Sequence, residues 1–359
     1  MNLVEIMISE RAIGSDHPTY FIADISANHD GDLERAKALI HLAAEAGADG
    51  AKFQNFRAPK IVSDYGFKNL KDQLSHQSTW KKSVYEVYES ASLSFDWTPS
   101  LKETCDEAGI HYFSSPYDFE AVNMLDPYVP AHKIGSGDIT WLEILRHIAG
   151  KGKPVIMATG ASRMGEVQRA VSTILEINKQ LILMQCNTNY TASLENFHHI
   201  HLNVLKSYHA MFPELVLGLS DHTPGHATVL GAVALGARAV EKHFTDDNAR
   251  VGPDHPFSMT PESWREMVDR TRELEFALGL PDKRVASNET ETVIVQRRCL
   301  RAAREIKKGE TLTRDMIDVL RPAPPEAIMP YEIDRAVDTR ASEDIPFGEA
   351  LRWTMLVDA

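Results

Sequence analysis

The chain has 359 residues, which is too long for one small domain and leaves room for a barrel of roughly 250 residues and an additional module. Its formal net charge of −13 argues against nucleic acid or an anionic membrane as the main partner. No run approaches the roughly 18 apolar residues of a membrane span, and the N-terminus lacks the basic segment of a signal peptide. The three widely spaced cysteines show no disulfide or zinc pattern, so we expect a cytoplasmic protein.

Short apolar runs alternate with helical patterns over most of the chain. In the first repeat, an apolar run at residues 20–25 is followed by Asp32, which can cap a helix, and by a helical stripe that stops at Gly47. The β-like runs begin near residues 20, 50, 110, 131, 154, 181, 215 and 239, which makes eight. Eight strands that alternate with helices predict an α/β fold of the (β/α)8 TIM-barrel type.

Two polar stretches interrupt this pattern. The first, residues 55–83, is long for a connection in a barrel, and we expect it to be an excursion that faces the substrate. The second, residues 281–292, has neither a helical nor a strand period and is interpreted as a linker. The predicted domains are therefore a barrel over residues 1–280 and a small domain over residues 293–359, whose core is marginal alone.

Two histidines follow consecutive strands at the end of the predicted barrel. His222 and His243 are 21 residues apart, about the length of one β/α unit. Adjacent parallel strands place both imidazoles on the same face of the barrel, where neutral imidazoles can share a divalent metal. Several acidic residues are close in sequence, which favours a metal site. The alternative is that both histidines are ordinary polar residues of loops.

Two lysines, Lys52 and Lys133, lie in or at the end of apolar strand runs. A lysine in such a position must reach solvent or meet an anion, and the alternative is a structural ion pair with Asp or Glu. The small loops at residues 135–137 and 158–160 carry amides and hydroxyls that suit phosphate. Together these features favour a phosphorylated small substrate. Further polar candidates at the strand ends are Asp24, Asn28, His29, Gln54, Ser115, Ser136, Asp138, Thr159, Thr188, Tyr190, Ser220 and Asp254.

Several segments resemble the sialic acid synthases and related nonulosonic acid synthases. The matching motifs are FIADISANHDGDLERAKALI, AGADGAKFQ, HKIGSGD, GKPVIMATG, GLSDHTPG, EKHFTDD and GPDH. Near the C-terminus, REIKKGETLTRDMIDVLRP resembles the antifreeze-like (SAF) module that ends those synthases. The resemblance covers roughly residues 20–355. It implies a transferase that condenses phosphoenolpyruvate with the open-chain aldehyde of an N-acylated aminosugar, giving a 2-keto-3-deoxy nine-carbon acid and phosphate.

The resemblance also implies roles for individual residues. His222 and His243 would hold a divalent metal, Mn2+ or alternatively Mg2+ or Co2+. Phosphoenolpyruvate would be bound by Lys52, Lys133, Ser115, Ser136, Thr188 and Ser220. The sugar would be faced by Gln54, Tyr190 and Asp254, and Arg321 would reach it from the small domain of a partner subunit in a domain-swapped homodimer.

Catalysis is expected to involve Asp138, Asp24 and Lys133. One of the aspartates would move the proton of the attacking water, or an aspartate would only orient a lysine. Lys52 and Lys133 would offset the charge of the carboxylate and phosphate.

Some positions depart from the pattern of the synthases. Asp24 and Asp138 stand where glutamate is common, and Ala158 stands where serine is common. The segments ISANH and YEVYESA resemble the pseudaminic and legionaminic branches more than the sialic branch. Two alternative functions remain: another phosphoenolpyruvate-condensing or aldolase-type barrel enzyme, and a catalytically inactive sugar-binding homologue.

Overall fold

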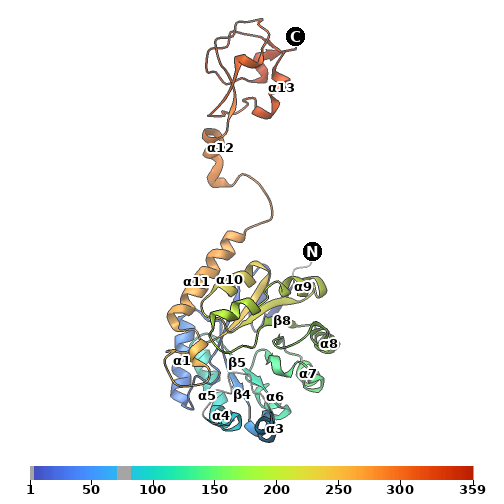
Figure 1. Cartoon of the computed structure of the whole chain (residues 1–359), viewed down its shortest axis with the longest axis vertical. Coiled ribbons are helices and arrows are strands. Elements are labelled where there is room, and N and C mark those ends of the chain that lie inside the picture. Colours follow the sequence, from blue (N-terminus) through green and yellow to red (C-terminus); the bar gives the residue numbers. More distant parts are fainter. Residues whose placement is uncertain (1–3, 71–81, 359) are drawn as a thin grey trace. The chain divides into compact units, whose positions relative to one another are not determined.

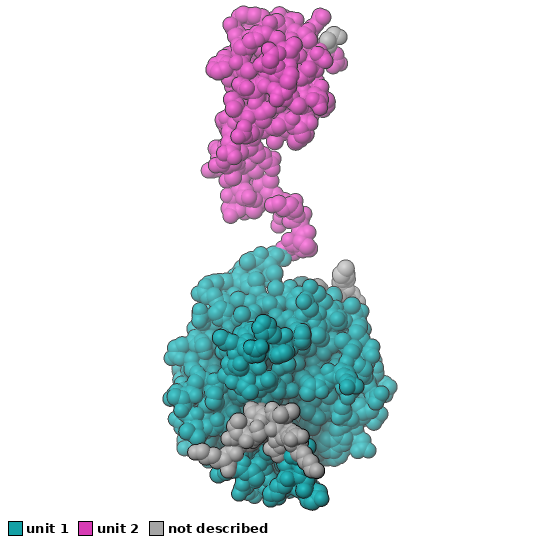
Figure 2. Space-filling model, in the orientation of Figure 1, with its two compact units in different colours: residues 1–279 teal, residues 280–359 magenta. Residues whose placement is uncertain are grey.

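A computed structural model describes residues 4–70 and 82–358 of the chain. The chain forms two compact units, residues 1–279 and residues 280–359, which are coloured separately in Figure 2. Part of the predicted substrate-facing excursion, residues 71–81, lies outside the described residues.

The first unit contains an eight-stranded parallel sheet among its described residues, in the order β5-β4-β3-β10-β9-β8-β7-β6. β5 and β6, at the two ends of this order, lie against each other and nearly close the sheet (Figure 1). The prediction of a (β/α)8 TIM barrel is therefore confirmed. The strands are β3 (Tyr20–Asp24), β4 (Gly50–Asn55), β5 (His111–Pro116), β6 (His132–Ile134), β7 (Val155–Ala158), β8 (Leu181–Cys186), β9 (Val216–Asp221) and β10 (Ala237–His243).

Helices surround the sheet (Figure 1). The last of them has well-defined ends: Thr260 caps it through a capping box with Ser263, Pro261 is its first residue, and Gly279 follows its end with a positive φ. No described helix combines the length and apolar character needed to cross a membrane. The α-helices of this unit are α1 (Leu33–Glu45), α2 (Ala58–Ile61), α3 (Asp64–Asn69), α4 (Val84–Ala91), α5 (Thr98–Glu107), α6 (Phe119–Leu125), α7 (Leu142–Ala149), α8 (Met164–Leu175), α9 (Val204–Met211), α10 (Ala227–Ala234) and α11 (Pro261–Leu278).

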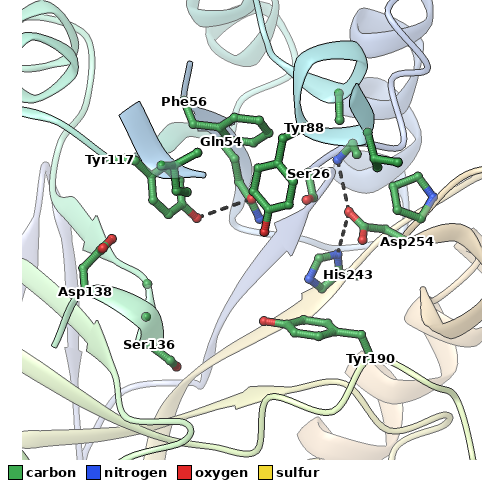
Figure 3. Close-up of a pocket in the computed structure, with 17 residues that line it drawn as sticks. Ser26, Gln54, Phe56, Tyr88, Tyr117, Ser136, Asp138, Tyr190, His243 and Asp254 are labelled. Atoms are coloured by element: carbon green, nitrogen blue, oxygen red, sulfur yellow. Dashed lines mark hydrogen bonds and ion pairs between the residues drawn. The ribbon is translucent and has the colours of Figure 1, made fainter. Parts of the chain in front are cut away.

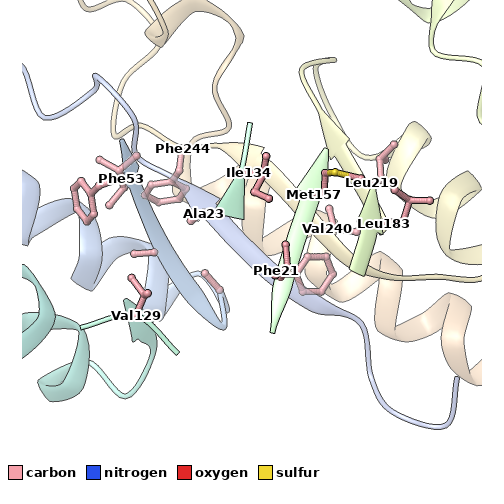
Figure 4. Close-up of a cluster of buried hydrophobic side chains, with 14 of the residues drawn as sticks. Phe21, Ala23, Phe53, Val129, Ile134, Met157, Leu183, Leu219, Val240 and Phe244 are labelled. Carbon is pink, nitrogen blue, oxygen red and sulfur yellow. The ribbon is translucent and has the colours of Figure 1, made fainter. Parts of the chain in front are cut away.

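Alternate residues of each barrel strand belong to two different hydrophobic clusters, because successive side chains of a strand point to opposite faces. One set packs against the helices and includes Phe21, Phe53, Met157, Leu183 and Val240 (Figure 4). The other set fills the barrel interior and includes Tyr20, Ile22, Phe113, Ile156, Ile182 and Met184. The interior is therefore a packed apolar core over the first residues of the strands.

A hairpin that the sequence analysis did not predict precedes the barrel. Its strands, β1 (Glu5–Ile8) and β2 (Arg11–Gly14), pair antiparallel. Ile8 and Ile13 of the hairpin are fully buried in the same cluster as the interior side chains of the barrel. Because this cluster occupies the N-terminal part of the strands, the hairpin seals that end, and polar groups gather at the opposite end.

The second unit has a small core of its own, which includes Leu300, Leu312 and Leu351. Its short strands are β11 (Cys299–Ala302), β12 (Ile317–Leu320), β13 (Arg340–Ala341) and β14 (Leu356–Val357), and its helices are α12 (Thr290–Gln296) and α13 (Ile333–Ala336). Residues 281–292, interpreted from the sequence as a linker without a helical or strand period, include a 3-10 turn at Ser287–Glu289 that leads into α12. The Glu289 carboxylate accepts the Ala286 N–H and so supports the start of this local structure.

Candidate active site

The C-terminal ends of the barrel strands surround two adjoining cavities. The inner cavity has a volume of about 50 Å³ and the outer cavity about 400 Å³. Gln54, Tyr117, Ser136, Tyr190 and His243 line both of them (Figure 3). The inner cavity is also lined by Asp24, Lys52, Ser115, Lys133, Cys186, Ser220, His222 and Glu241, and the outer cavity by Ser26, Phe56, Tyr88, Asp138 and Asp254.

The inner cavity is polar because the inward-facing residues of the strands are apolar near the start of each strand and polar near its C-terminal end. On β3 the interior positions Tyr20 and Ile22 are followed by Asp24, and on β10 Ala239 is followed by Glu241 and His243. A period of two residues keeps all of these side chains on the inside of the barrel. The strand ends that the sequence analysis selected therefore converge on one place.

Buried ion pairs cross the inner cavity. The Lys52 ammonium lies 2.6 Å from a carboxylate oxygen of Asp24 and 3.7 Å from Glu241, and the Lys133 ammonium lies 3.4 Å from the same Glu241 oxygen. All four side chains are buried. Both lysines thus have the structural ion pairs that the sequence analysis left open as an alternative to anion binding. Glu241 stands between them and was not among the predicted site residues.

The two lysines differ in their electrostatic environment. Burial acts to lower the pKa of Lys52, but the carboxylates of Asp24 and Glu241 outweigh it, and the pKa of Lys52 is raised. For Lys133 burial prevails over the attraction of Glu241, and its pKa is lowered.

Several buried polar atoms at this place have no hydrogen-bond partner among the described residues. They include Ser115 Oγ, Asp24 Oδ1 and Glu241 Oε2. Leaving buried polar groups unsatisfied costs roughly 1–3 kcal/mol each, and such groups in a cavity are typical of a site that a ligand completes.

The histidine pair lies at the boundary of the two cavities. The ring centroids of His222 and His243 lie 5.3 Å apart. The centroid of the Tyr190 ring lies 4.4 Å from that of His222, and the centroid of the Phe257 ring lies 4.9 Å from that of His243. His222 Nδ1 is 2.9 Å from the Asn187 carbonyl, so this nitrogen carries the proton and Nε2 keeps its lone pair.

The chemistry of this pair fits a metal site with open positions. Burial, and after it the nearby His243, lowers the pKa of His222 to about 3, so its imidazole is neutral near pH 7, as a metal ligand must be. No group of three or more His, Cys, Asp or Glu side chains within residues 4–70 and 82–358 is arranged to hold a metal. A divalent ion here would have two imidazole ligands and take the rest from solvent or substrate, as catalytic sites do.

A buried ion pair on the outer face of β9 and β10 holds the strands that carry these histidines. The Lys242 ammonium contacts the Asp221 carboxylate, and both side chains are almost completely buried. Asp221 also accepts hydrogen bonds from the hydroxyls of Thr223 and Thr228, at 2.9 Å and 2.6 Å. Every charge of this pair is compensated, so the turn that presents His222 is tightly defined.

Asp138 occupies a different position from Asp24. It ends the 3-10 turn Ser136–Asp138 that follows β6, and it lines the outer cavity (Figure 3). Burial raises its pKa to about 6, against the opposing attraction of Lys133. A carboxyl with this pKa can accept or donate a proton near neutral pH.

Not every predicted residue lines a cavity. The Thr188 methyl lies against Gly160, whose N–H donates to Ser136 Oγ at 2.9 Å, so Thr188 borders the site without lining it. Asn28 instead binds the Phe244 carbonyl and the Ser258 hydroxyl, and Thr159 donates to the Met184 carbonyl. Arg321 belongs to the second unit, where its side chain is exposed, and its contact with a sugar stays a prediction.

The motifs of the chain match known families over most of its length. The profile of the NeuB family matches residues 39–283, and that of the SAF domain matches residues 297–357. The chain belongs to the NeuB family. Its C-terminal unit is a SAF domain, and both features of the resemblance noted in the sequence are confirmed.

Relatives of this NeuB family member carry synthase names. It is 33% identical to the N,N'-diacetyllegionaminic acid synthase of Legionella pneumophila, covering 95% of each chain. It is also 33% identical to the human N-acetylneuraminate-9-phosphate synthase, covering 86% of this chain and 85% of the relative. The structure of the N-acetylneuraminic acid synthetase of Leptospira borgpetersenii is 27% identical and superposes with a TM-score of 0.71, covering 81% of this chain and 96% of that one.

Some residues of the site were missed by the sequence analysis. Glu241 lies two residues before His243 on the same strand, so strand alternation alone places it inside the barrel. Tyr117 follows β5 directly, and its hydroxyl lies 3.4 Å from Gln54 Oε1. Of the apolar residues on one side of the outer cavity, Phe56 directly follows β4, whereas Ile61, Val87, Tyr88 and Ala91 lie on α2 and α4, and no strand end points to these four.

The raised pKa of Asp138 leads to a test on stability. Between the ordinary carboxyl pKa near 4 and about 6, the folded state holds a proton that the unfolded chain releases, so this carboxyl destabilises the fold increasingly as pH rises. The stability of Asp138→Asn relative to wild type should therefore increase as pH rises from about 4 to 8. The increase should be on the order of 1–2 kcal/mol, which is less than the full pKa shift implies, because Asp138 is partly exposed to solvent. Denaturant unfolding at both pH values measures this difference.

Asp282, an exposed residue near the start of the second unit, provides the control. Asp282→Asn should change stability equally at the two pH values. A pH-independent difference for Asp138→Asn would show that burial does not raise the pKa of this carboxyl.

Proposed function

We propose that this protein condenses phosphoenolpyruvate with the open-chain aldehyde of an N-acylated aminosugar, giving a 2-keto-3-deoxy nine-carbon sugar acid and phosphate. The observation that carries the proposal is the division of the site. A small inner cavity holds two buried lysines, and it opens into an outer cavity of about 400 Å³, large enough for a sugar. Membership in a family of synthases supports the same reaction class.

The inner cavity suits phosphoenolpyruvate. Lys52 and Lys133 supply positive charge in a place that water scarcely reaches, where electrostatic attraction is strong. The hydroxyls of Ser115, Ser136 and Ser220 line or border the same space and can donate to carboxylate or phosphate oxygens. Thr188 borders this space and is proposed to take part in the same binding.

The reaction joins the two cavities at their boundary. The enol carbon C3 of phosphoenolpyruvate attacks the aldehyde carbon, water adds at C2, and the bond from C2 to the phosphate oxygen breaks. A divalent ion held by His222 and His243, Mn2+ or alternatively Mg2+ or Co2+, would act as a Lewis acid toward the aldehyde oxygen. Lys133 and Lys52 offset the charge of the anion throughout.

The water that adds at C2 must lose a proton, and Asp138 and Asp24 are the candidates to accept it. The pKa of Asp138, raised by burial to about 6, suits a base that works near neutral pH. Asp24 instead contacts the Lys52 ammonium and lies 3.5 Å from His243 Nε2, which favours the alternative that it orients these groups. Gln54, Tyr190 and Asp254 line the outer cavity and are proposed to bind the sugar.

The function is tested by release of phosphate from phosphoenolpyruvate in the presence of N-acylated aminosugar aldehydes. Lys52→Met and Lys133→Met should raise the KM for phosphoenolpyruvate by about 10- to 100-fold and change the KM for the sugar little, since losing a charge-assisted contact costs about 1.5–3 kcal/mol. Thermal melts check that each variant folds. Equal effects on both substrates would place the lysines elsewhere, and absence of phosphate release with every aldehyde would refute the function.

The metal is tested by binding as well as by activity. Titration of the metal-free protein with Mn2+, followed by electron paramagnetic resonance, should show one tight site that His222→Ala and His243→Ala each abolish. Turnover should be lost on chelation with EDTA and return with Mn2+. His209→Ala, an exposed histidine of α9, is the control and should bind Mn2+ as wild type does. Full turnover after exhaustive chelation would end the metal proposal.

Arg321 is proposed to complete the sugar site of a partner subunit in a domain-swapped homodimer. Its side chain is exposed and pairs with no described acidic residue, so its charge is available for a partner. Mixing Arg321→Ala with His222→Ala should regenerate activity, because one site of a mixed dimer then has neither defect. Each variant alone should stay inactive. If subunit exchange is demonstrated and no activity returns, the two residues do not act across subunits.

A further inference from the structure

The segment between β10 and α11, residues 244–260 and here called the β10 connection, carries groups that face the site. It contains the 3-10 helix η5 (His255–Phe257), and Asp254 precedes this helix as its N-cap. Asp254 lines the outer cavity, and its carboxylate lies 3.8 Å from His243 Nδ1 (Figure 3). Phe257, the last residue of η5, packs against the same histidine with ring centroids 4.9 Å apart. The position of η5 therefore sets both contacts.

Side chains shape the β10 connection and anchor the residue that follows η5. Within the connection, Asn248 donates to the carbonyls of His255 and Ser258, at 2.6 Å and 2.7 Å. Asn28, after β3, donates to the Ser258 hydroxyl at 2.9 Å and ties this residue to the barrel. One end of η5 is thus fixed. At its other end, the position of η5 depends on the contacts of its first residue, His255.

His255 belongs to a group of contacts centred on Asp30, in the segment after β3. Its Nε2 lies 2.9 Å from one carboxylate oxygen of Asp30, and Arg35 and Arg250 lie 3.0 Å and 3.1 Å from the other oxygen. Because a carboxylate only accepts hydrogen bonds, Nε2 carries the proton of its contact. His255 Nδ1 lies 2.7 Å from the Thr245 hydroxyl, so both ring nitrogens have a partner.

The His255 side chain is the most buried of this group. It is 0% exposed, whereas the side chain of Arg250 is 40% exposed. An exposed ion pair contributes little, because water competes for both charges, but a buried polar group that loses its partner is left unsatisfied. Gly252 lies directly against the ring, since a Cβ on this residue would be 2.6 Å from His255 Cδ2. The backbone of the β10 connection therefore closes over the imidazole and fixes its place.

Building on the proposed function, we infer that His255 is a positioning residue that holds η5 against Asp30 and so keeps Asp254 in place for the sugar. The same contact keeps Phe257 against His243. His255 lines neither cavity, so it acts through these neighbours and not on a substrate. A histidine that only stabilised the fold would contribute to stability without favouring one substrate over the other.

Two substitutions separate the two contacts of His255. The side-chain amide of glutamine reaches the place of Nε2, whereas that of asparagine reaches only the place of Nδ1, so His255→Gln keeps the contact with Asp30 and His255→Asn loses it. His255→Asn should raise the KM for the N-acylated aminosugar aldehyde about tenfold, because Asp254 is displaced. The KM for phosphoenolpyruvate should stay unchanged, and His255→Gln should keep both KM values near those of wild type.

Gly252→Ala perturbs the same contact without removing either partner. The added Cβ would lie 3.0 Å from His255 Nε2 and 3.6 Å from the Asp30 carboxylate, so it displaces the imidazole from Asp30. This variant should therefore raise the KM for the sugar as His255→Asn does.

His132 provides a matched control. It is a buried histidine that lines neither cavity, and its Nε2 lies 3.0 Å from the Asp126 carboxylate. His132→Asn should lower the melting temperature, as His255→Asn does, but should change neither KM. If His255→Asn behaved like this control, His255 would have a structural role only and the inference would be wrong.

Hydrogen exchange followed by mass spectrometry gives a readout that does not depend on the reaction. The amides of residues 246–258 should exchange faster in His255→Asn and Gly252→Ala than in wild type, and at the wild-type rate in His255→Gln. Unchanged exchange in both of the first two variants would overturn the inference and leave the proposed reaction intact. Failure of every aldehyde to release phosphate in wild type would overturn the proposed function, while the exchange rates would still decide whether His255 holds the β10 connection.

Discussion

The barrel depends on a chain of buried charges that connects strands across its C-terminal end. Asp24 of β3, Lys52 of β4, Glu241 of β10 and Lys133 of β6 lie within contact distance of their neighbours in this order. Removing one member would leave a buried charge without a partner, which costs about 3–5 kcal/mol. Such a chain is a weak source of stability by itself, because desolvation offsets most of the attraction. Its unsatisfied oxygens show instead that the arrangement is suited to receive a ligand.

The same alternation that builds the core delivers these charges to one place. Inward side chains are apolar near the start of each strand, where Ile8 and Ile13 of the hairpin seal the barrel, and polar near the end. The apolar layer excludes water beneath the ion pairs and so lowers the local dielectric constant. A short chain segment at the opposite end of the barrel thereby strengthens the electrostatic interactions among these buried charges.

Much of this could be predicted from the sequence, because the strands are short apolar runs and parallel strands present their C-terminal ends together. That argument located His222, His243 and both lysines, which the structure brings to one cavity. Glu241 was missed because a single acid in an apolar run is equally typical of a surface strand, although its position two residues before His243 on β10 places it inside the barrel. Ile61, Val87, Tyr88 and Ala91 of the outer cavity were missed because they follow no strand end, and their convergence depends on how α2 and α4 pack.

Different parts of the chain build the two cavities. The inner cavity is built by strand residues whose positions are tied to hydrogen-bonded register, so its chemistry changes only at a cost to the core. The apolar side of the outer cavity lies mainly on the connection between β4 and β5, and half-buried positions of α4 such as Val87 and Ala91 can change without disturbing any strand. Under the proposed function, the groups that bind the anion and the apolar groups that face the acceptor therefore belong to different parts of the chain.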